Sequence, residues 1–498
     1  MIIRDDVSRV LRGAASAILI NPPIYDTQYW AYWSQPHGLL KIATWLKSKG
    51  YARLRLIDCL ATDDKRRVPM RRKHVVERDD IRKQVYEFGM SLTDIEKHLR
   101  STDFVPDEIW ITSTMTYWWE STRDIINVVK RVYPGHTPRI LVGGIYPTLF
   151  PKHADKNLGA DSDVDIVVVD GEICDDAANA WSDLSLYNDD PLYKTKPRYA
   201  LITGSRGCPF DCSYCAQLTL NHGIRKVRGR TPEDVADEIE DKYMRYGVRE
   251  IAFYEDNLLF NREDFLARLA EVRKRNLKIS IFAPEGIEPR LVELDLLKEM
   301  RATGFKKLHL ALETIDDEIA RQWNRRQGTI ERFEVAVEIA RKAGWAIGSQ
   351  DLNAFVMFGL PEENLEAVVN TALYASCKVG SVVPMLFTPV PGSSLFRQHE
   401  EYLFSRITAD GRQWDLQDLN GKLLPFLEFN RARYSWLRGS DYLSLESFMM
   451  HLNNSKVRRR TFNLAGEGIV PSAFRRTLID YAPSNKRFLQ SASCGRML

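Results

Sequence analysis

Short apolar segments alternate with helical stretches from residue 198 to about residue 400. This alternation is typical of parallel β/α units, in which a helix follows each strand and packs on the sheet. Helix signals separate the segments: Thr231 can cap a helix that begins at Pro232 and stops at Gly247. The pattern predicts an incomplete barrel of six units. Its strands are expected at 200–204, 249–254, 278–283, 307–312, 350–358 and 381–387.

Three of the seven cysteines, Cys208, Cys212 and Cys215, lie within eight residues directly after the first predicted strand. Thiolates at spacings of four and three residues can each hold one iron of a cubane cluster, which leaves the fourth iron without a protein ligand. A substrate or cosubstrate can bind that iron. In barrels of this kind the chemistry takes place at the C-terminal ends of the strands, where these cysteines lie. An iron–sulfur cluster is therefore predicted.

Spacing alone leaves two other uses of these cysteines open. One is a zinc site completed by His222, although zinc sites usually show two ligand pairs about a dozen or more residues apart. The other is a set of buried structural thiols, which is an unusual use in a loop flanked by Gly207, Pro209 and Asp211. A disulfide framework is not expected, because the chain has an odd number of cysteines spread over 498 residues.

The run SRGCPFDCSYCA, residues 205–216, resembles the signature of radical S-adenosylmethionine (SAM) enzymes. The resemblance implies a 4Fe-4S cluster on Cys208, Cys212 and Cys215, with the amino and carboxylate groups of SAM on the fourth iron. It implies reductive cleavage of SAM to methionine and a 5'-deoxyadenosyl radical, with an external electron donor of the flavodoxin or ferredoxin type. RGRTPEDVADEIEDKYMRYGVREIAFYEDN, LLKEMRATGFKKLHLALE and FTPVPGSSLF resemble the subclass with an N-terminal cobalamin-binding-type domain, and the likeness covers roughly residues 15–400.

Polar residues near the ends of other barrel strands are candidate SAM contacts, by position and by the same resemblance. The family places groups for the SAM amino group after the second strand, a ribose ligand on the fourth strand and an adenine contact on the fifth. The alternatives are helix capping by residues 255–257 and a surface salt bridge for Glu313. The candidates are Tyr254, Glu255, Asp256, Asn257, Glu313, Ser349, Gln350 and Asn353.

Residues 15 to about 185 predict an open doubly wound sheet. Its strands are AILIN, RLRLID, EIWITS, RILVGG and DIVVVDGE, and ligands of such sheets lie across the strand C-termini. The segment resembles cobalamin-binding domains in Asn21-Pro22-Pro23, in Gly143-Gly144 followed by Pro147-Thr148, and in Gly171-Glu172. In that family the paired glycines let the backbone approach the nucleotide tail of the cofactor.

The loop PPIYDTQYWAYWSQPHG departs from the Asp-x-His-x-x-Gly motif of many cobalamin domains. Asp26-Thr27-Gln28 has no histidine at the matching spacing, and His37 lies too far along. A bound cobalt would lack a histidine lower ligand, as is common in this radical subclass. Aromatic residues after the first and third strands can instead stack on a corrin, plug its site or form an interface core. The candidate cobalamin contacts are Trp30, Trp33, Tyr117, Trp118, Gly143, Gly144 and Glu172.

We therefore predict an α/β protein with a Rossmann-like cobalamin-binding-type domain at 1–185, a partial (β/α)6 TIM-like radical SAM barrel at 195–400, and a mainly helical extension at 404–498. The extension is expected to cap the open side of the barrel and help select the substrate. Residues 65–83 hold nine Lys and Arg against three acidic residues. They are expected to form a solvated connecting segment, with contact to an anionic partner or substrate as the alternative.

Composition narrows the class of partner. Lys and Arg number 70 against 67 Asp and Glu, a net charge of +3, which argues against a surface built to wrap nucleic acid. Apolar runs fall short of the roughly 20 residues that span a bilayer. Asp5 and Asp6 precede a first strand rather than a secretory segment. We expect a cytoplasmic protein with a small-molecule substrate and no membrane or nucleic-acid partner.

Several functions remain after this reading. The first is cobalamin-dependent radical methyl transfer to an unactivated carbon or to phosphorus. The second keeps the cluster and has a vestigial cobalamin domain; its reaction is a cyclisation, a rearrangement, C–C bond formation or transfer of the aminocarboxypropyl group of SAM. A tRNA methylthiotransferase is disfavoured, because it needs three N-terminal cysteines and only Cys59 and Cys174 lie there. A zinc-bearing interaction module is the last option.

Overall fold

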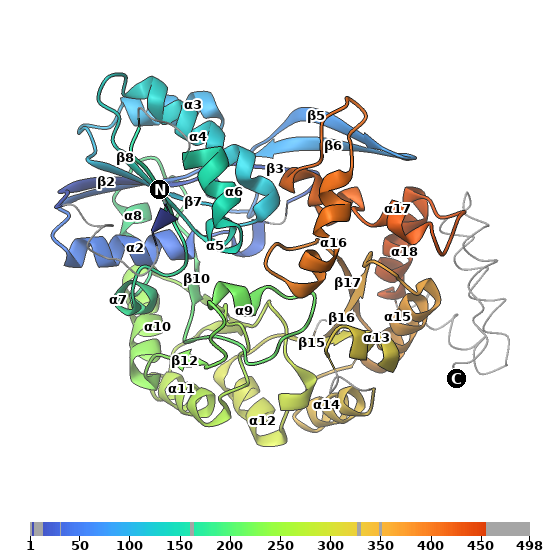
Figure 1. Cartoon of the computed structure of the whole chain (residues 1–498). Coiled ribbons are helices and arrows are strands. Elements are labelled where there is room, and N and C mark those ends of the chain that lie inside the picture. Colours follow the sequence, from blue (N-terminus) through green and yellow to red (C-terminus); the bar gives the residue numbers. More distant parts are fainter. Residues whose placement is uncertain are drawn as a thin grey trace, which may run out of the picture.

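The computed structural model describes residues 2–3, 13–29, 31–159, 164–325, 330–347 and 351–454. An N-terminal α/β domain lies above a partial barrel in Figure 1, and the segment from residue 394 to residue 454, orange to red, runs beside both. The predictions for Trp30, Ser349, Gln350 and the chain beyond residue 454 lie outside the described residues. In the described part of the chain, no helix has the length and apolar character needed to cross a membrane.

The N-terminal domain is a six-stranded parallel sheet between two layers of helices. Alternate residues of strand β2 (Ser16–Asn21) enter different cores. Ala17 and Leu19 pack with helix α2 (His37–Ser48), and Ile18 and Ile20 pack with α3 (Leu92–Arg100) and α4 (Trp119–Val132). A strand covered on both faces is apolar at every position, which explains the run AILI. The strand order is β1 (Ile2–Ile3), β9 (Ile166–Val169), β8 (Arg139–Gly143), β7 (Glu108–Thr112), β2 (Ser16–Asn21) and β4 (Arg53–Asp58).

The order in which successive strands are added to this parallel sheet reverses at β2. β4 pairs on one side of β2, and β7, which follows later in the chain, pairs on the other side. In open α/β sheets such a reversal of strand order opens a crevice at the carboxyl ends of the two neighbouring strands, where ligands bind. The loops after β2 and β7 therefore flank the ligand crevice that the fold predicts.

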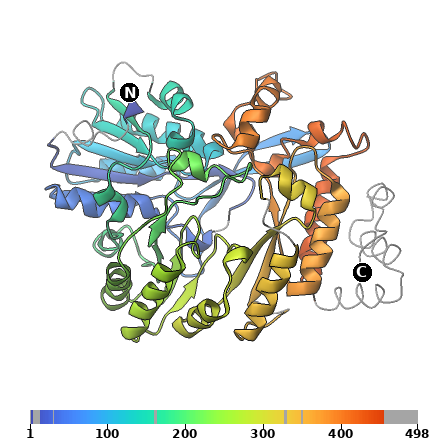
Figure 2. The same cartoon turned by 60° about the horizontal axis from the view of Figure 1, so that its bottom comes forward.

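The barrel consists of two three-stranded parallel sheets, joined by single bridges at Ile281–Phe305 and Ile287–Leu310. The predicted α/β fold class is confirmed, with all six strands close to the expected segments. The helices lie on the outer side of the strands (Figure 2). The strands are β10 (Tyr199–Ile202), β13 (Glu250–Phe253), β14 (Ser280–Phe282), β15 (Leu308–Glu313), β16 (Leu352–Phe358) and β17 (Val382–Leu386), and the long helices are α10 (Pro232–Tyr246), α11 (Arg262–Lys274), α12 (Leu294–Thr303), α14 (Ile330–Lys342) and α15 (Leu365–Val379).

The basic segment 65–83 is mostly exposed to solvent, as predicted, but most of it forms a strand rather than an irregular connection. It belongs to a strand pair, β5 (Met70–Arg78) and β6 (Ile81–Phe88), with β3 (Ile24–Asp26) on the other edge of β6. Buried apolar residues of β6 anchor the pair, and Arg78 of β5 pairs with Asp418. This hairpin was not predicted from the sequence, because β5 is highly charged and the buried apolar residues lie mainly on β6.

The C-terminal segment connects the two domains. Helices α16 (Ser394–Ser405) and α18 (Gly439–Leu452) pack on the cores of the molecule, and α18 contacts β17. Between them, residues 414–426 lie against the N-terminal domain. The Trp119 indole donates to Gln417 at 2.8 Å, and the Asn420 amide donates to buried Asp26 at 2.9 Å. This segment therefore helps to fix the N-terminal domain over the barrel.

Candidate active site

The three-cysteine loop follows β10 and the short strand β11 (Ser205–Arg206) at the C-terminal end of the barrel. Gly207 begins the loop with a φ of 106°, and a Cβ there would lie 2.7 Å from the Lys226 carbonyl oxygen. Its amide donates to the Asp256 carboxylate at 2.6 Å. Glycine is therefore required both by the backbone conformation and by the close approach of the neighbouring chain.

Two further side chains hold the outer part of the loop. Arg225 donates to the Pro209 carbonyl at 2.9 Å and to the Asp211 carboxylate at 2.7 Å. The Asn324 amide donates to the same carboxylate at 2.6 Å. The loop conformation is thus set by residues from three other parts of the barrel before any ligand binds.

The three thiols differ in exposure: Cys208 and Cys212 are half-buried, and Cys215 is exposed. Burial raises the pKa of Cys208 and of Cys212, and it raises the pKa of Cys215 to about 12 although its side chain still reaches solvent. Free thiols with raised pKa values are protonated at neutral pH. Binding of iron must therefore release their protons, because the thiolate is the ligand form.

His222 does not join the cysteines. Its imidazole packs on Gly171 of the N-terminal domain, where a Cβ would overlap the ring. Its Nε2 atom is buried at this contact and has no hydrogen-bond partner among the described residues. Within the described part of the chain, no three His, Cys, Asp or Glu side chains converge as ligands of a single ion do. The zinc site completed by His222 thus has no support in this geometry.

The four candidates that follow β13 divide between two sides of the strand. Asp256 binds Gly207, and the Asn257 amide nitrogen lies 3.7 Å from the Cys208 sulfur, so both contact the cysteine loop. Tyr254 packs with Tyr199 in the aromatic cluster of the barrel interior. Three of the four are therefore on the side of the predicted cofactors.

Glu255 turns to the outer side and forms a buried ion pair with Arg268 of α11, at 2.7 Å. Its carboxylate also accepts from the Gly204 amide at 3.0 Å and from the Ser205 hydroxyl. Burial raises the pKa of Glu255, against the opposing effect of Arg268. Glu255 thus anchors the start of the cysteine loop from behind.

Glu313 ends β15 in a left-handed conformation, with a φ of 66°, where the pairing with β16 shifts register. Burial raises its pKa to about 7, and Arg325 opposes that shift. Arg325 is itself tied to Glu288 at 3.3 Å and to the Ala311 carbonyl. The proposed surface salt bridge for Glu313 was wrong, because the residue is buried. Asn353, a candidate on the neighbouring strand, is opposite His309 and also buried.

Sequence reasoning missed Glu285 and His309. Glu285 follows β14 and its side chain still reaches solvent, yet partial enclosure of its carboxyl by the protein raises its pKa, with a smaller contribution from Asp256. His309 stacks on Phe355 with centroids 5.4 Å apart, and burial lowers its pKa to about 4. The position after a strand end identifies Glu285. The alternation of LHLALE, whose leucines enter the outer core, identifies His309 as an inward residue.

The loops after β2 and β7 meet at the predicted crevice. The Trp118 indole donates to Asp26 at 2.8 Å, and its ring lies edge-on to Tyr29 with centroids 6.2 Å apart. Beside them is a cavity of about 720 Å³, with Tyr25, Asp26 and Tyr117 on one wall and strand β5 and residues 406–428 on the others.

The other candidate cobalamin residues lie elsewhere or serve local contacts. Trp33 packs against Tyr199 and Phe282 of the barrel. Gly144 has a φ of 110° and approaches β7 so closely that a Cβ would lie 2.5 Å from the Ser113 carbonyl oxygen. Gly143 ends β8. Glu172 pairs with Arg206 at 3.0 Å and with Arg228 at 2.8 Å, and so joins the two domains.

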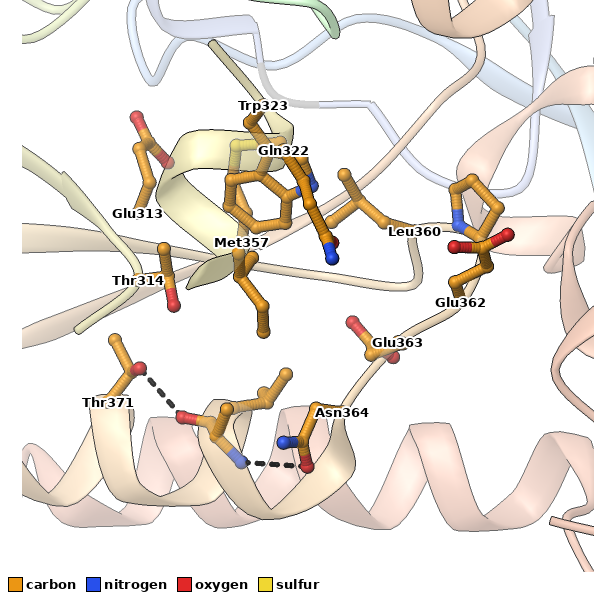
Figure 3. A pocket seen from close by; sticks show the side chains of 14 residues that line it. Glu313, Thr314, Gln322, Trp323, Met357, Leu360, Glu362, Glu363, Asn364 and Thr371 are labelled. Carbon is orange, nitrogen blue, oxygen red and sulfur yellow. Dashed lines mark hydrogen bonds between the residues drawn. The ribbon is translucent and has the colours of Figure 1, made fainter. Parts of the chain in front are cut away.

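A small cavity of about 20 Å³ lies behind Glu313, between the strand ends and the start of α15 (Figure 3). Its wall includes Glu363, which is buried and accepts from the Gly359 amide at 2.6 Å. Burial raises the pKa of Glu363 to about 7 from its ordinary 4.5. The native protein therefore holds a proton here that the unfolded chain loses as the pH rises above 4.5.

We expect Glu363→Gln to stabilise the protein at pH 8. The stabilisation that the protonated Glu363 carries is fully present below pH 4.5 and is lost as the pH rises through 7. Glutamine keeps the acceptor without the charge, so the gain is up to about 3 kcal/mol at pH 8 and near zero at pH 4. Urea unfolding of the variant and of the wild type at pH 8 and pH 4 measures this gain in the free energy of unfolding. Glu362→Gln, at the exposed neighbour, is the control; an equal response of the two variants contradicts the prediction.

The sequence pattern of the Radical SAM superfamily matches residues 202–375. An uncharacterized methyltransferase of Pyrococcus horikoshii is 26% identical over 49% of this chain. The match spans about half, 51%, of that relative's own length. The cytidylyl-2-hydroxyethylphosphonate methyltransferase of Streptomyces wedmorensis is 23% identical, over 73% of this chain and 77% of its own.

Two solved structures share the fold over most of the chain. One is the radical SAM methyltransferase TsrM of Kitasatospora setae with tryptophan and a SAM analogue, which is 15% identical and has a TM-score of 0.57. That match covers 79% of this chain and 77% of TsrM. The other is the cobalamin-dependent SAM radical enzyme OxsB, which is 13% identical with a TM-score of 0.56, over 98% of this chain and 76% of OxsB.

Proposed function

We propose, from the match of residues 202–375 to the Radical SAM superfamily, that this chain is a cobalamin-dependent radical SAM methyltransferase that acts on a small-molecule substrate. The observation that carries the proposal is the loop of Cys208, Cys212 and Cys215 at the C-terminal end of the first barrel strand, under a Rossmann-like domain. Relatives named as methyltransferases and the shared fold with TsrM and OxsB support methyl transfer.

The residues at the barrel end fit a 4Fe-4S cluster and SAM. Three thiols project from one pinned loop, and carboxyl groups of Asp256, Glu285 and Glu313 follow three of the strands that surround it. Carboxylates suit the amino and hydroxyl groups of SAM. When bound, the cluster and SAM supply the 5'-deoxyadenosyl radical, and cobalamin supplies the methyl group.

The protein's own part is to position the cysteine loop and to enclose the reacting groups. Asp256 fixes the loop through Gly207, and Glu255 with Arg268 fixes the strand end before it. The aromatic cluster around Tyr199, with Trp33 packed against it, fills part of the barrel interior with apolar side chains. Exclusion of water and of stray C–H groups matters because a primary carbon radical reacts with nearly any C–H bond it meets.

The N-terminal crevice offers partial support for a corrin. The cavity of about 720 Å³ lies beside the loops where the strand order reverses and has the flat rings of Tyr25 and Tyr117 on its wall. Against it, Trp118 is held by Asp26, and Asn420 binds the same carboxylate, so part of the crevice is filled from within. These contacts of Asp26 with Trp118 and Asn420 favour a second candidate, a radical SAM enzyme with the same cluster and no cobalamin.

One experiment separates the two candidates. Protein purified and reconstituted without oxygen is assayed for tightly bound cobalamin, and its SAM products are measured. The first candidate predicts about one cobalamin per chain, with 5'-deoxyadenosine and S-adenosylhomocysteine in the presence of substrate. The second predicts no retained cobalamin. It also predicts 5'-deoxyadenosine alone or, for aminocarboxypropyl transfer, methylthioadenosine.

For the first candidate we expect Tyr117→Ala to weaken cobalamin binding by about threefold to tenfold, since an aromatic contact contributes about 0.5–1.5 kcal/mol. Equilibrium dialysis against cobalamin measures the change. Tyr243→Ala is the matched control, because that ring lies on the outer helix α10 over Arg249. Equal affinities of the two variants would contradict a corrin at Tyr117.

A further inference from the structure

The side chain of Asn257 contacts Cys208, one of the three predicted cluster ligands. Its Nδ2 atom is 3.7 Å from the Cys208 sulfur, within the range of an N–H···S hydrogen bond. The two preceding side chains are fixed, Asp256 by the Gly207 amide and Glu255 by Arg268. The turn that carries Asn257 is thus held from both sides, and its amide is presented to the sulfur by the fold.

We propose that Asn257 is a positioning residue that raises the reduction potential of the cluster. A donor pointed at a ligating sulfur stabilises negative charge on the cluster. The reduced cluster carries one more electron than the oxidised one, so the donor stabilises the reduced form more. The electron comes from the flavodoxin- or ferredoxin-type donor. The inference rests on the cluster of the proposed function, and it is independent of cobalamin and substrate.

This role differs from a contact with the SAM amino group, which the sequence predicts for the same residue. A contact with SAM acts only when SAM is bound. A hydrogen bond to the Cys208 sulfur acts in the cluster-loaded protein without SAM as well. The reduction potential of the SAM-free protein therefore isolates the proposed role from the other one.

The test is a redox titration of the reconstituted holoprotein without SAM, followed by the electron paramagnetic resonance signal of the reduced cluster. Asn257→Leu keeps the size and removes the donor. At the wild-type midpoint its ratio of reduced to oxidised cluster is expected to fall about threefold or more, in proportion to a lost hydrogen bond to a charged group. In Asn257→Asp we expect this ratio to fall further, because a negatively charged carboxylate replaces the donor. In Asn257→Gln we expect part of the wild-type ratio to return, because glutamine keeps the amide donor.

Asn261→Leu is the matched control, since Asn261 precedes α11 four residues further along the chain. An unchanged midpoint in Asn257→Leu overturns the inference while leaving the proposed function in place. Failure of Asn257→Leu to assemble a cluster that Asn261→Leu assembles also overturns it, since Asn257 would then be needed for assembly. If the wild-type chain assembles no 4Fe-4S cluster, the proposed function and this inference fail together.

Discussion

Cys212→Ala is expected to abolish cluster assembly and SAM cleavage. Two thiolates cannot hold three irons of the cube, and the pinned loop offers no other thiol to replace the lost one. Iron and acid-labile sulfide per chain should fall from about four each to near zero. In the presence of a strong reductant, 5'-deoxyadenosine should fall below detection.

Cys377→Ala is the control for that variant. Cys377 is exposed on α15, on the outer side of the barrel, and it should keep full iron, sulfide and SAM cleavage. The fold should survive in both variants, because the loop is held by Arg225, Asn324 and Asp256 rather than by the thiols. SAM cleavage by a Cys212→Ala protein at a rate near wild type would contradict the assignment of the cluster.

Arg268→Leu is expected to cost about 3–5 kcal/mol of folding free energy, because it leaves the buried Glu255 carboxylate without its counter-charge. Arg268 is 1% exposed, and its Nη1 atom lies 2.7 Å from the Glu255 carboxylate. The pair also packs on Gly204 at the start of the cysteine loop. We therefore expect a lower urea midpoint in the apo protein and a lower iron content after reconstitution.

Arg262→Leu tests whether any lost arginine on the same helix has this effect. Arg262 pairs with Glu293 and Asp295 at the surface, with about a third of its side chain exposed. Exposed pairs contribute about 0.2–1 kcal/mol, so this variant should unfold near the wild-type midpoint. Equal destabilisation by the two substitutions would show that burial of the Arg268–Glu255 pair is not what matters.

The barrel and the cysteine loop were predictable because local signals agree there. The strands of the barrel alternate with helices that carry their own caps, such as Thr231, whose hydroxyl accepts from the Asp234 amide, and Gly247 with a φ of 67°. The loop motif depends on spacing within eight residues. Where the information is local, the sequence predicts both the element and its place at the barrel end.

Side-chain direction and long-range contacts were not predictable in the same way. Glu255 and Asp256 are adjacent, yet one binds Arg268 behind the strand and the other binds Gly207 in front of it. Trp33 and Trp118 both follow sheet strands, yet Trp33 reaches the barrel and Trp118 binds Asp26. The partners of Glu255 and Asp256 lie 13 and 49 positions away, and the partner of Trp118 lies 92 positions away. No local pattern contains these partners.

The strand pair β5–β6 was missed for a related reason. Most of its charges do lie in solvent, but Arg78 pairs with Asp418 and lies over Trp414, both from the C-terminal segment. A charge run indicates solvent exposure without showing whether the exposed segment is a loop or a strand. The partner here lies 340 residues further along the chain.

The most direct test of the account is Mössbauer spectroscopy of oxygen-free protein reconstituted with enriched iron, before and after addition of SAM. A 4Fe-4S cluster on Cys208, Cys212 and Cys215 predicts one distinct iron whose spectrum shifts when SAM binds, while the other three remain unchanged. A cluster whose four irons all keep their spectra when SAM is added would contradict the account, and so would a protein that assembles no such cluster.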